Sequence, residues 1–381
     1  MATPTNLQSG NPGIGTVTRS PQTTNTPDVR NAPFTRLSRM ATRRIVTITG
    51  TAFGNPINPQ LLAVGGHIQR LRLEIVASGG TAGGTSAVAA ADGAYNVIQN
   101  LLFQDPFGTQ IYNVDGWSLR MLMAYGCQFG QWGVSAPDAL ASYVAPSTGG
   151  NFTLPLYLPF QLDSSAYCCL ASMNAASLPT LSINYNTLAN VFSTVPGGTA
   201  PTLKATISAD YWGAPIMNAN LAPPGVGSYA PWSLTVGAQS IPSASQQYTT
   251  LQKVGSYIHT LILTLRDSTG VRVDDWPLND LQLLVDNVPI FNESFNARID
   301  KMITAYNFTR PTGVIVYPFR QSVQDMVTAA DTHDTDLYTT PATSLEVGGT
   351  FQAVGNAPAT VQAVTGELYP SGGIPWTHLA S

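Results

Sequence analysis

The densest group of side chains that could bind a cation is Asp331, His333, Asp334 and Asp336, within residues 331–336. Hard cations such as Ca²⁺ favour several carboxylates on one flexible loop, so this spacing makes the cluster a candidate calcium site. The glycine and the terminal glutamate of an EF-hand loop are missing, and a solvated acidic turn accounts for the same residues. We therefore expect no metal or other cofactor, with Ca²⁺ at this cluster as the one candidate.

No catalytic motif accompanies the four histidines. None of them lies in a His-Glu-x-x-His zinc motif or accompanies a Gly-x-Ser-x-Gly serine elbow. The glycine-rich residues 78–85 lack the lysine and the following helix that a phosphate-binding P-loop requires. The three cysteines, Cys127, Cys168 and Cys169, are too few for a disulfide framework or a zinc site. We predict that the protein is not an enzyme.

Basic residues gather at the N-terminus. Residues 1–44 contain six arginines and one acid, a net charge of +5, which leaves −9 for the remainder. Residues 1–43 are rich in Thr, Asn, Pro, Gly and Ser, so we expect a flexible basic arm. Its arginines could bind the phosphates of lipid headgroups or nucleic acid, or could serve only to keep the arm soluble. The candidates for contact are Arg36, Arg39, Arg43 and Arg44.

Alternating apolar and polar residues predict a chain of short β-strands. The 34 glycines and 28 prolines, about one residue in six, leave little room for long helices. In residues 203–211 every second side chain is apolar, and the alternate ones, from Lys204 to Asp210, are predicted to face solvent. Pro155 and Pro159 cannot donate to a strand ladder, which favours an edge strand there. The strands are predicted near residues 45–51, 70–75, 94–104, 109–114, 154–160, 179–186 and 203–211.

The second half of the chain has the same pattern after a break. Residues 216–245 contain Pro, Gly, Ser and Ala without a sustained period and are predicted to be a linker. We therefore expect one domain over residues 44–215 and a second over residues 246–381. Strands of the second domain are predicted near residues 247–254, 257–266, 281–286, 288–292, 313–319, 344–352 and 359–369.

A repeat about 180 residues apart relates the two halves. Residues 100–126 and residues 281–307 each read as a strand, a turn that begins at Asp, a second strand that ends in Asn, and a helix. Asp115 and Ser294 are the predicted N-caps of the two helices. The repeat indicates two related β-domains, each with a short helix after a central hairpin.

The low charge of the chain indicates extensive contact with other proteins. Charged residues are only 10% of the sequence, whereas an average soluble protein has roughly 25%. Interface cores are depleted of charged side chains, so we expect large areas to be buried against other copies of the chain.

Residues 96–123 carry a family resemblance. The strand at Asn96–Asn100, the turn at Asp105-Pro106 and the helix start Asp115-Gly116-Trp117 resemble the first jelly roll of tectivirus coat proteins. With the basic arm and the repeat, the chain resembles the double jelly-roll major capsid proteins of tailless icosahedral viruses, the tectivirus–adenovirus lineage. The resemblance implies an all-β fold of two tandem eight-stranded jelly rolls, each with a short helix after a central hairpin.

The same resemblance implies a structural role in a bacteriophage virion. Homotrimers would form pseudo-hexagonal capsomers, which would join into an icosahedral shell after assembly in the host cytoplasm. The basic arm would lie at the inner face, near an internal lipid membrane that some relatives of this architecture lack. Minor capsid and vertex proteins would be further partners, and any genome contact would be non-specific.

The competing interpretation is a jelly-roll lectin-like carbohydrate-binding or adhesion protein. That interpretation predicts bound calcium and a cluster of exposed aromatic residues, and only residues 331–336 agree with it. A hydrolase on the same scaffold is a further alternative, but the sequence offers no convincing acid/base or nucleophile set.

Overall fold

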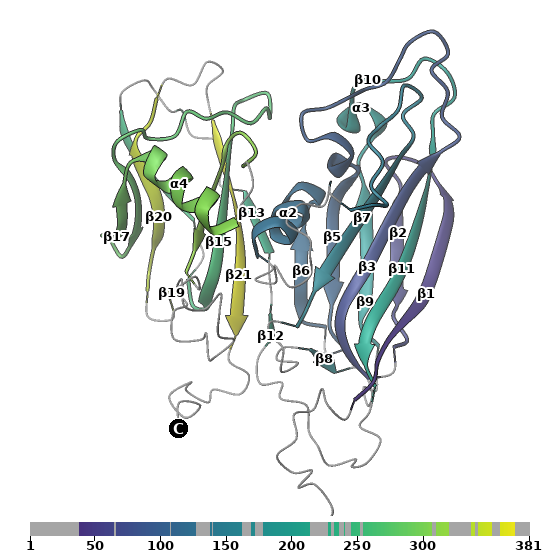
Figure 1. The fold of residues 1–381 in the computed structure, drawn as a ribbon, viewed down its shortest axis with the longest axis horizontal. Helices are drawn as coiled ribbons and strands as arrows, with labels where there is room; N and C mark the ends of the chain where they lie inside the picture. Colours follow the sequence, from purple (N-terminus) through teal and green to yellow (C-terminus); the bar gives the residue numbers. More distant parts are fainter. Residues whose placement is uncertain are drawn as a thin grey trace, which may run out of the picture.

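A computed structural model gives the fold of the chain as two β-sandwiches side by side (Figure 1). The first, drawn in purple to teal, is built from residues before 214, and the second, in green and yellow, from residues after 231. The structure describes residues 38–64, 66–106, 108–126, 138, 140–161, 169–171, 178–213, 228–229, 232–235, 240, 245–251, 254–306, 310–319, 337–339, 342–352 and 359–369.

The first sandwich consists of two antiparallel four-stranded layers. One layer has the order β1 (Met40–Thr51), β11 (Thr202–Trp212), β3 (His67–Ser78) and β7 (Phe152–Pro159). The other has the order β2 (Pro56–Leu61), β9 (Thr180–Tyr185), β5 (Ile98–Gln104) and β6 (Gln110–Val114).

The second sandwich has the same topology. One layer has the order β13 (Trp232–Thr235), β21 (Thr360–Tyr369), β15 (Tyr257–Arg266) and β18 (Val314–Pro318). The other has the order β14 (Gln246–Thr250), β20 (Leu345–Thr350), β16 (Leu281–Val285) and β17 (Val288–Glu293). When the eight principal strands are numbered along each sandwich, both give the layers 1-8-3-6 and 2-7-4-5. That order is the jelly roll, and the expected double jelly roll is confirmed.

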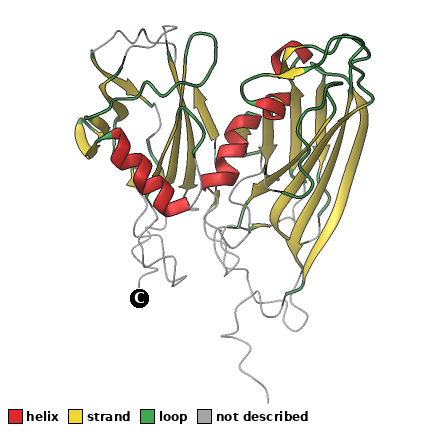
Figure 2. Cartoon of the chain, turned by 45° about the horizontal axis from the view of Figure 1, so that its top comes forward, coloured by secondary structure: helices red, strands yellow, loops and turns green. Residues whose placement is uncertain are grey.

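Short elements complete both units. Among the helices (Figure 2), α2 and α4 follow the central hairpins β5–β6 and β16–β17 at the predicted places. The helical elements are η4 (Gly93–Val97), α2 (Gly116–Met121), η5 (Leu122–Gly126), α3 (Leu188–Val191) and α4 (Phe295–Tyr306). The remaining strands are β4 (Val88–Ala89), β8 (Leu170–Ala171), β10 (Phe192–Thr194), β12 (Ser228–Tyr229) and β19 (Leu337–Tyr338). No helix in the described part of the chain is long and apolar enough to cross a membrane.

The alternation seen in the sequence corresponds to the two faces of each strand. In β11 the apolar residues from Leu203 to Ala209 are buried in the core and Lys204 is exposed, as predicted. Asp210 departs from the pattern, because arginines on β3 cover it and leave it 2% exposed. β7 lies at the end of its layer, which confirms the edge strand expected from Pro155 and Pro159.

Two boundaries differ from the sequence-based expectation. Residues 94–97 belong to η4 rather than to the strand predicted over residues 94–104. β12 and β13 lie inside residues 216–245, where a linker was expected, and β13 is the first principal strand of the second jelly roll. A strand of four residues is too short to produce a visible alternation.

The two jelly rolls share one continuous sheet. β13 lies parallel to β6, with Trp232 opposite Asn113, so layer 2-7-4-5 of the first unit continues into layer 1-8-3-6 of the second. The fifth strand of one jelly roll therefore lies beside the first strand of the next.

Candidate functional site: the junction between the jelly rolls

The junction between the jelly rolls begins with the motif Asp115-Gly116-Trp117 at the start of α2. Only glycine fits at position 116, because a Cβ there would lie 2.0 Å from the carbonyl oxygen of Tyr95. This close approach allows α2 to pack against η4. The helix thereby lies between the two units, in contact with both.

Asp115 caps the helix α2 and also contacts the second jelly roll. One carboxylate oxygen accepts a hydrogen bond from the backbone N–H of Ser118 at 2.6 Å, which confirms the predicted N-cap. The other accepts from the side-chain amide of Gln362, on β21 of the second jelly roll. Gln362 also donates to the Ser118 hydroxyl at 3.0 Å. The helix cap is therefore also a contact between the two jelly rolls.

Trp117 is the largest side chain of α2 and is 2% exposed. Its indole N–H donates to the hydroxyl of Thr264 on β15 at 3.3 Å. The guanidinium of Arg272, also from the second jelly roll, lies 4.2 Å from the ring centroid. A desolvated cation–π contact of this kind contributes on the order of 2 kcal/mol. Trp117 of the first unit thus contacts Thr264, Arg272 and, at 5.8 Å from its ring, Arg266 of the second.

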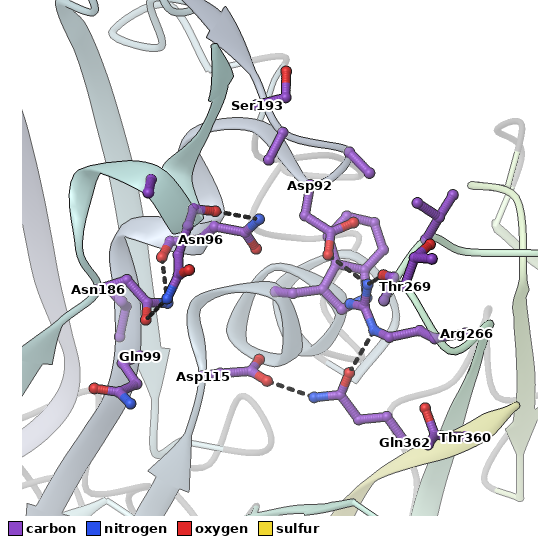
Figure 3. A pocket seen from close by; sticks show the side chains of 18 residues that line it. Asp92, Asn96, Gln99, Asp115, Asn186, Ser193, Arg266, Thr269, Thr360 and Gln362 are labelled. Atoms are coloured by element: carbon purple, nitrogen blue, oxygen red, sulfur yellow. Dashed lines mark hydrogen bonds and ion pairs between the residues drawn. The ribbon is translucent and has the colours of Figure 1, made fainter. Parts of the chain in front are cut away.

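Asp92, just before η4, forms the ionic part of the junction (Figure 3). Its carboxylate pairs with the Arg266 guanidinium at 2.7 Å and with that of Arg272 at 2.7 Å, while the Asp92 side chain is 5% exposed. Both arginines belong to the second jelly roll. Because a desolvated carboxylate without a cation is costly, this triad requires the two units to stay together.

Arg120 on α2 completes the stack on the side of the first jelly roll. Its guanidinium lies 5.0 Å from the Trp117 ring and 4.7 Å from the Tyr95 ring, and pairs with Asp138 at 2.6 Å. Tyr95 donates its hydroxyl to the same carboxylate. Burial, with this hydrogen bond, raises the pKa of Tyr95, so the phenol is neutral and is a structural donor.

A cleft of about 640 Å³ lies between η4, α3 and the loop after β15 (Figure 3). Asp92, Asp115 and Trp117 are among the residues that line it. Amide side chains of the first unit line one wall, and Arg266 with Gln362 the other. The carboxylates of the cleft, Asp92 and Asp115, already accept bonds from Arg266, Arg272 and Gln362. The arrangement therefore fixes the angle between two domains and offers no uncommitted acid for chemistry.

The candidate residues from the sequence lie elsewhere. Arg43 and Arg44 are exposed on β1, and Arg39 is exposed just before it. β1 begins at the lower end of the first jelly roll in Figure 1, away from α3 and β10. Arg36 and the cluster Asp331, His333, Asp334 and Asp336 lie outside the described residues. Within the described ranges, no group of three or more His, Cys, Asp or Glu could hold a metal ion.

Sequence reasoning did not identify the junction partners Asp92, Arg266, Arg272 and Gln362. The available signal was the motif at residues 115–117, which marks a helix start but not what that helix packs against. The partners are up to 247 residues away along the chain, and only the fold brings them together.

No protein-family model and no curated protein matches the sequence of this chain. Solved structures do match it. The crystal structure of the major capsid protein of Sulfolobus turreted icosahedral virus is 16% identical with a TM-score of 0.63, covering 90% of this chain and 99% of that one. The PBCV-1 virus capsid is 11% identical with a TM-score of 0.61, covering 88% and 95%. The Faustovirus major capsid protein is 8% identical with a TM-score of 0.59, covering 87% and 90%.

The match extends over both jelly rolls and over nearly the full length of each solved chain. Within this chain the same strand order occurs twice, and one sheet joins the two units. The chain has the double jelly-roll fold found in these viral major capsid proteins.

Proposed function

We propose that the protein is a major capsid protein, whose homotrimers form pseudo-hexagonal capsomers that build an icosahedral virion shell. The observation that carries this proposal is the repeated 1-8-3-6 and 2-7-4-5 topology, held rigid by the junction around Trp117 and Asp92. A jelly-roll lectin would need only one such unit and no fixed angle between two. The carbohydrate-binding alternative therefore has less support.

The proposal has consequences for partners and location. Neighbouring capsomers, minor capsid proteins and vertex proteins would contact the trimer in the virion, after assembly in the host cytoplasm. Arg39, Arg43 and Arg44 would lie at the inner end of the capsomer, with Arg36 in the arm before them. There they would meet an internal lipid membrane, each cation contributing on the order of 1 kcal/mol, or touch the genome without sequence specificity.

The absolute mass of the purified protein in solution tests the proposal. Light scattering after size exclusion should give about 121 kDa, three chains of 40.3 kDa, and the species should survive dilution. Negative-stain images of that species should have a hexagonal outline. A 40.3 kDa monomer at all concentrations would contradict the proposal.

Two additions to the same experiment address the arm and calcium. Replacement of Arg39, Arg43 and Arg44 by Gln should reduce co-flotation with anionic vesicles without changing the trimer mass. Addition of EDTA should leave that mass unchanged, because the proposed assembly needs no Ca²⁺ at Asp331–Asp336. Loss of the trimer in EDTA would instead support a structural calcium site.

A further inference from the structure

The cleft between the jelly rolls has a polar lining that the junction itself does not use. Its charged side chains neutralise one another, since Asp92 pairs with Arg266 and with Arg272 at the edge of the cleft. The second carboxylate, Asp115, already accepts a hydrogen bond from the amide of Gln362. These pairs leave the cleft without a net charge, so the groups available to hold a ligand are the neutral ones.

Gln99 lines the cleft from a β-bulge. Ile98 of β5 is opposite Tyr185, and Asn100 is opposite Asn184, so Gln99 is the extra residue of β5 at this place. Bulges re-aim side chains and are over-represented next to active sites. Gln99 is exposed, and its amide forms no hydrogen bond to any residue that the structure describes. The bulge thus presents an uncommitted amide to the cleft.

Further neutral polar side chains line both walls of the cleft (Figure 3). On the wall of the first jelly roll, the Asn186 amide donates to the backbone carbonyl of Asn96 at 2.8 Å and accepts from Asn190 at 3.2 Å. The side-chain oxygens of Asn96 and Asn190, and the hydroxyl of Thr360 on the opposite wall, accept no hydrogen bond from the described part of the chain. Amides and hydroxyls offer both donors and acceptors, so the two walls together can bind a ligand that carries both.

A carbohydrate matches this lining. Each sugar hydroxyl donates one hydrogen bond and accepts others, as the amides and hydroxyls of the cleft do. The volume of about 640 Å³ lies within the roughly 300–1,000 Å³ of small-molecule sites. An apolar ligand would leave the amides of the wall desolvated without partners, which is costly. The lining therefore selects a neutral, hydroxyl-rich ligand.

An extended peptide is the other neutral ligand that carries both donors and acceptors. One common mode of peptide binding adds a strand to the edge of a sheet, where the backbone supplies a ladder of partners. The walls of this cleft are instead η4, α3 and the loop after β15, and they present side-chain amides and hydroxyls. The arrangement thus favours a carbohydrate over a peptide.

We propose that this cleft binds a neutral oligosaccharide, through which the virion would attach to glycans on the surface of its host cell. α3 lies at the upper end of the first jelly roll, opposite to the start of β1 (Figure 1). The attachment role rests on the proposed function, because the basic arm at the inner face would leave this end on the outer surface of the shell. Carbohydrate binding would here accompany the shell role, whereas in the lectin alternative it replaces that role.

A single cleft should bind its ligand weakly. Small-molecule sites usually also contain aromatic contact area, but Trp117 is 2% exposed and is covered by the guanidinium groups of Arg272 and Arg120. Many clefts on one shell would bind together, and such multivalency raises the overall affinity by a factor of about 10²–10⁴. Weak single sites therefore suffice for attachment.

A glycan array with neutral and acidic oligosaccharides tests the assignment on the purified full-length protein. At least one neutral oligosaccharide should bind, in preference to the acidic ones, and its affinity is then measured by titration in an NMR experiment. Ala189→Trp should abolish this binding, because Ala189 is exposed on α3 and lines the cleft, so an indole there fills the space. Val144→Trp is the matched control, since Val144 is 53% exposed and is not part of the lining.

A second pair of variants tests the amide on the bulge. Gln99→Ala removes one neutral hydrogen-bonding group and should weaken binding about threefold to tenfold. Asn184→Ala removes an exposed amide of β9 that does not line the cleft, so it should leave the affinity unchanged. Circular dichroism and the mass in solution establish that each variant keeps the fold and assembly of the wild type.

The outcomes separate the inference from the proposed function. Neutral oligosaccharide binding that Ala189→Trp abolishes and Val144→Trp keeps supports the inference. Binding of no neutral oligosaccharide, a preference for acidic ones, or equal binding by Ala189→Trp overturns it and leaves the capsomer proposal standing. Binding of a neutral alanine–glutamine peptide in place of the sugars, blocked by Ala189→Trp, overturns the carbohydrate assignment. A monomeric protein that binds the sugar in its cleft overturns the capsomer proposal alone, because the cleft lies within one chain.

Discussion

The helix that follows the central hairpin has a different composition in the two jelly rolls, although its place in the topology is the same. α2–η5 has one charged residue, Arg120, within residues 116–126, and changes from an α-helix to a π-helical turn at Leu122. α4 is a regular helix of 12 residues with Arg298, Asp300 and Lys301 along it. The enclosed helix thus has one charged residue, whereas α4 has three, of which Asp300 and Lys301 are exposed.

The hairpins before the helices differ as well. The turn between β16 and β17 is Asp286-Asn287, both with positive φ, which is the two-residue type I′ turn that suits tight hairpins. Asp286 also accepts three hydrogen bonds from Thr343 and Ser344, and these bonds lower its pKa. In the first jelly roll Asp105 begins a longer turn and accepts from the backbone N–H of Thr109 at 2.8 Å. An aspartate therefore stabilises the hairpin turn in both jelly rolls, although the two turns differ in length.

Truncation of the junction residue should have the largest effect. Trp117→Ala removes a side chain that is 2% exposed, together with its contacts to Thr264 and Arg272. The free energy of unfolding should fall by about 3–5 kcal/mol. Asn296 is exposed on α4 and lies two residues after the Ser294 cap, as Trp117 lies two residues after Asp115, and Asn296→Ala should change the free energy of unfolding by less than about 0.5 kcal/mol. Denaturant titration of both variants measures the difference, and equal losses would show that the helices are not in different environments.

Loss of the ionic contact should come next in size. Asp92→Asn leaves Arg266 and Arg272 without their carboxylate, and the expected cost is about 3 kcal/mol, as for a broken buried pair. Because the two jelly rolls are then less tightly coupled, we expect calorimetry to resolve two thermal transitions for Asp92→Asn and one for the wild type. Lys301→Gln is the control, since its ammonium is 62% exposed and pairs with Glu293 within the second unit at a cost below about 1 kcal/mol. A single unshifted transition in Asp92→Asn would contradict the role of this triad.

Much of the fold could be predicted from the sequence, but the residues that form the junction could not. Two-residue alternation identified β3, β7 and β11, because one face of each strand is apolar, and the repeat identified both hairpin–helix units. The alternation failed at Asp210, whose burial depends on arginines of a neighbouring strand, and at β13, whose four residues are too few for a pattern. Local patterns carry no information on pairs such as Asp92 with Arg272, which only tertiary packing determines.

Protonation of Asp210 should have a smaller effect, seen only in acid. Burial opposes ionisation of this carboxyl, but hydrogen bonds from Thr42, Arg70 and Arg72 outweigh it and lower the pKa of Asp210. A lowered folded-state pKa stabilises the protein above the unfolded value, near 4, and this contribution is lost as pH falls through the folded value.

The corresponding measurement is the free energy of unfolding between about pH 5 and pH 2. Over this pH range, Asp210→Asn should lose less unfolding free energy than the wild type, by on the order of 1–2 kcal/mol. Thr42→Val removes one donor to Asp210, so its difference from the wild type should be smaller. The cluster lies on the outer face of β3 and β11, where Arg70 is opposite Asp210 next to a bulge at Gln69; the pair next to the equivalent bulge in the second jelly roll is the neutral Thr260 and Gly366. An unchanged pH profile in Asp210→Asn would mean that the arginines are equally satisfied without the carboxylate.

Exchange of the two helix caps should have the smallest effect and isolates what Asp115 adds beyond capping. The Ser294 hydroxyl accepts from the backbone N–H of Ala297 at 3.2 Å, so Ser294→Ala should cost about 1 kcal/mol, the usual value for a cap. Ser294→Asp keeps an acceptor at the helix N-terminus and should be neutral within a few tenths of a kcal/mol. Asp115→Ser likewise keeps a cap but shortens the reach to Gln362, so its cost should exceed that of Ser294→Asp by about 1 kcal/mol. If denaturant titration gives the same value for both exchanges, the bond across the junction adds nothing to the cap. A larger value for Asp115→Ser would mean that the first helix cap also stabilises the contact with the second jelly roll.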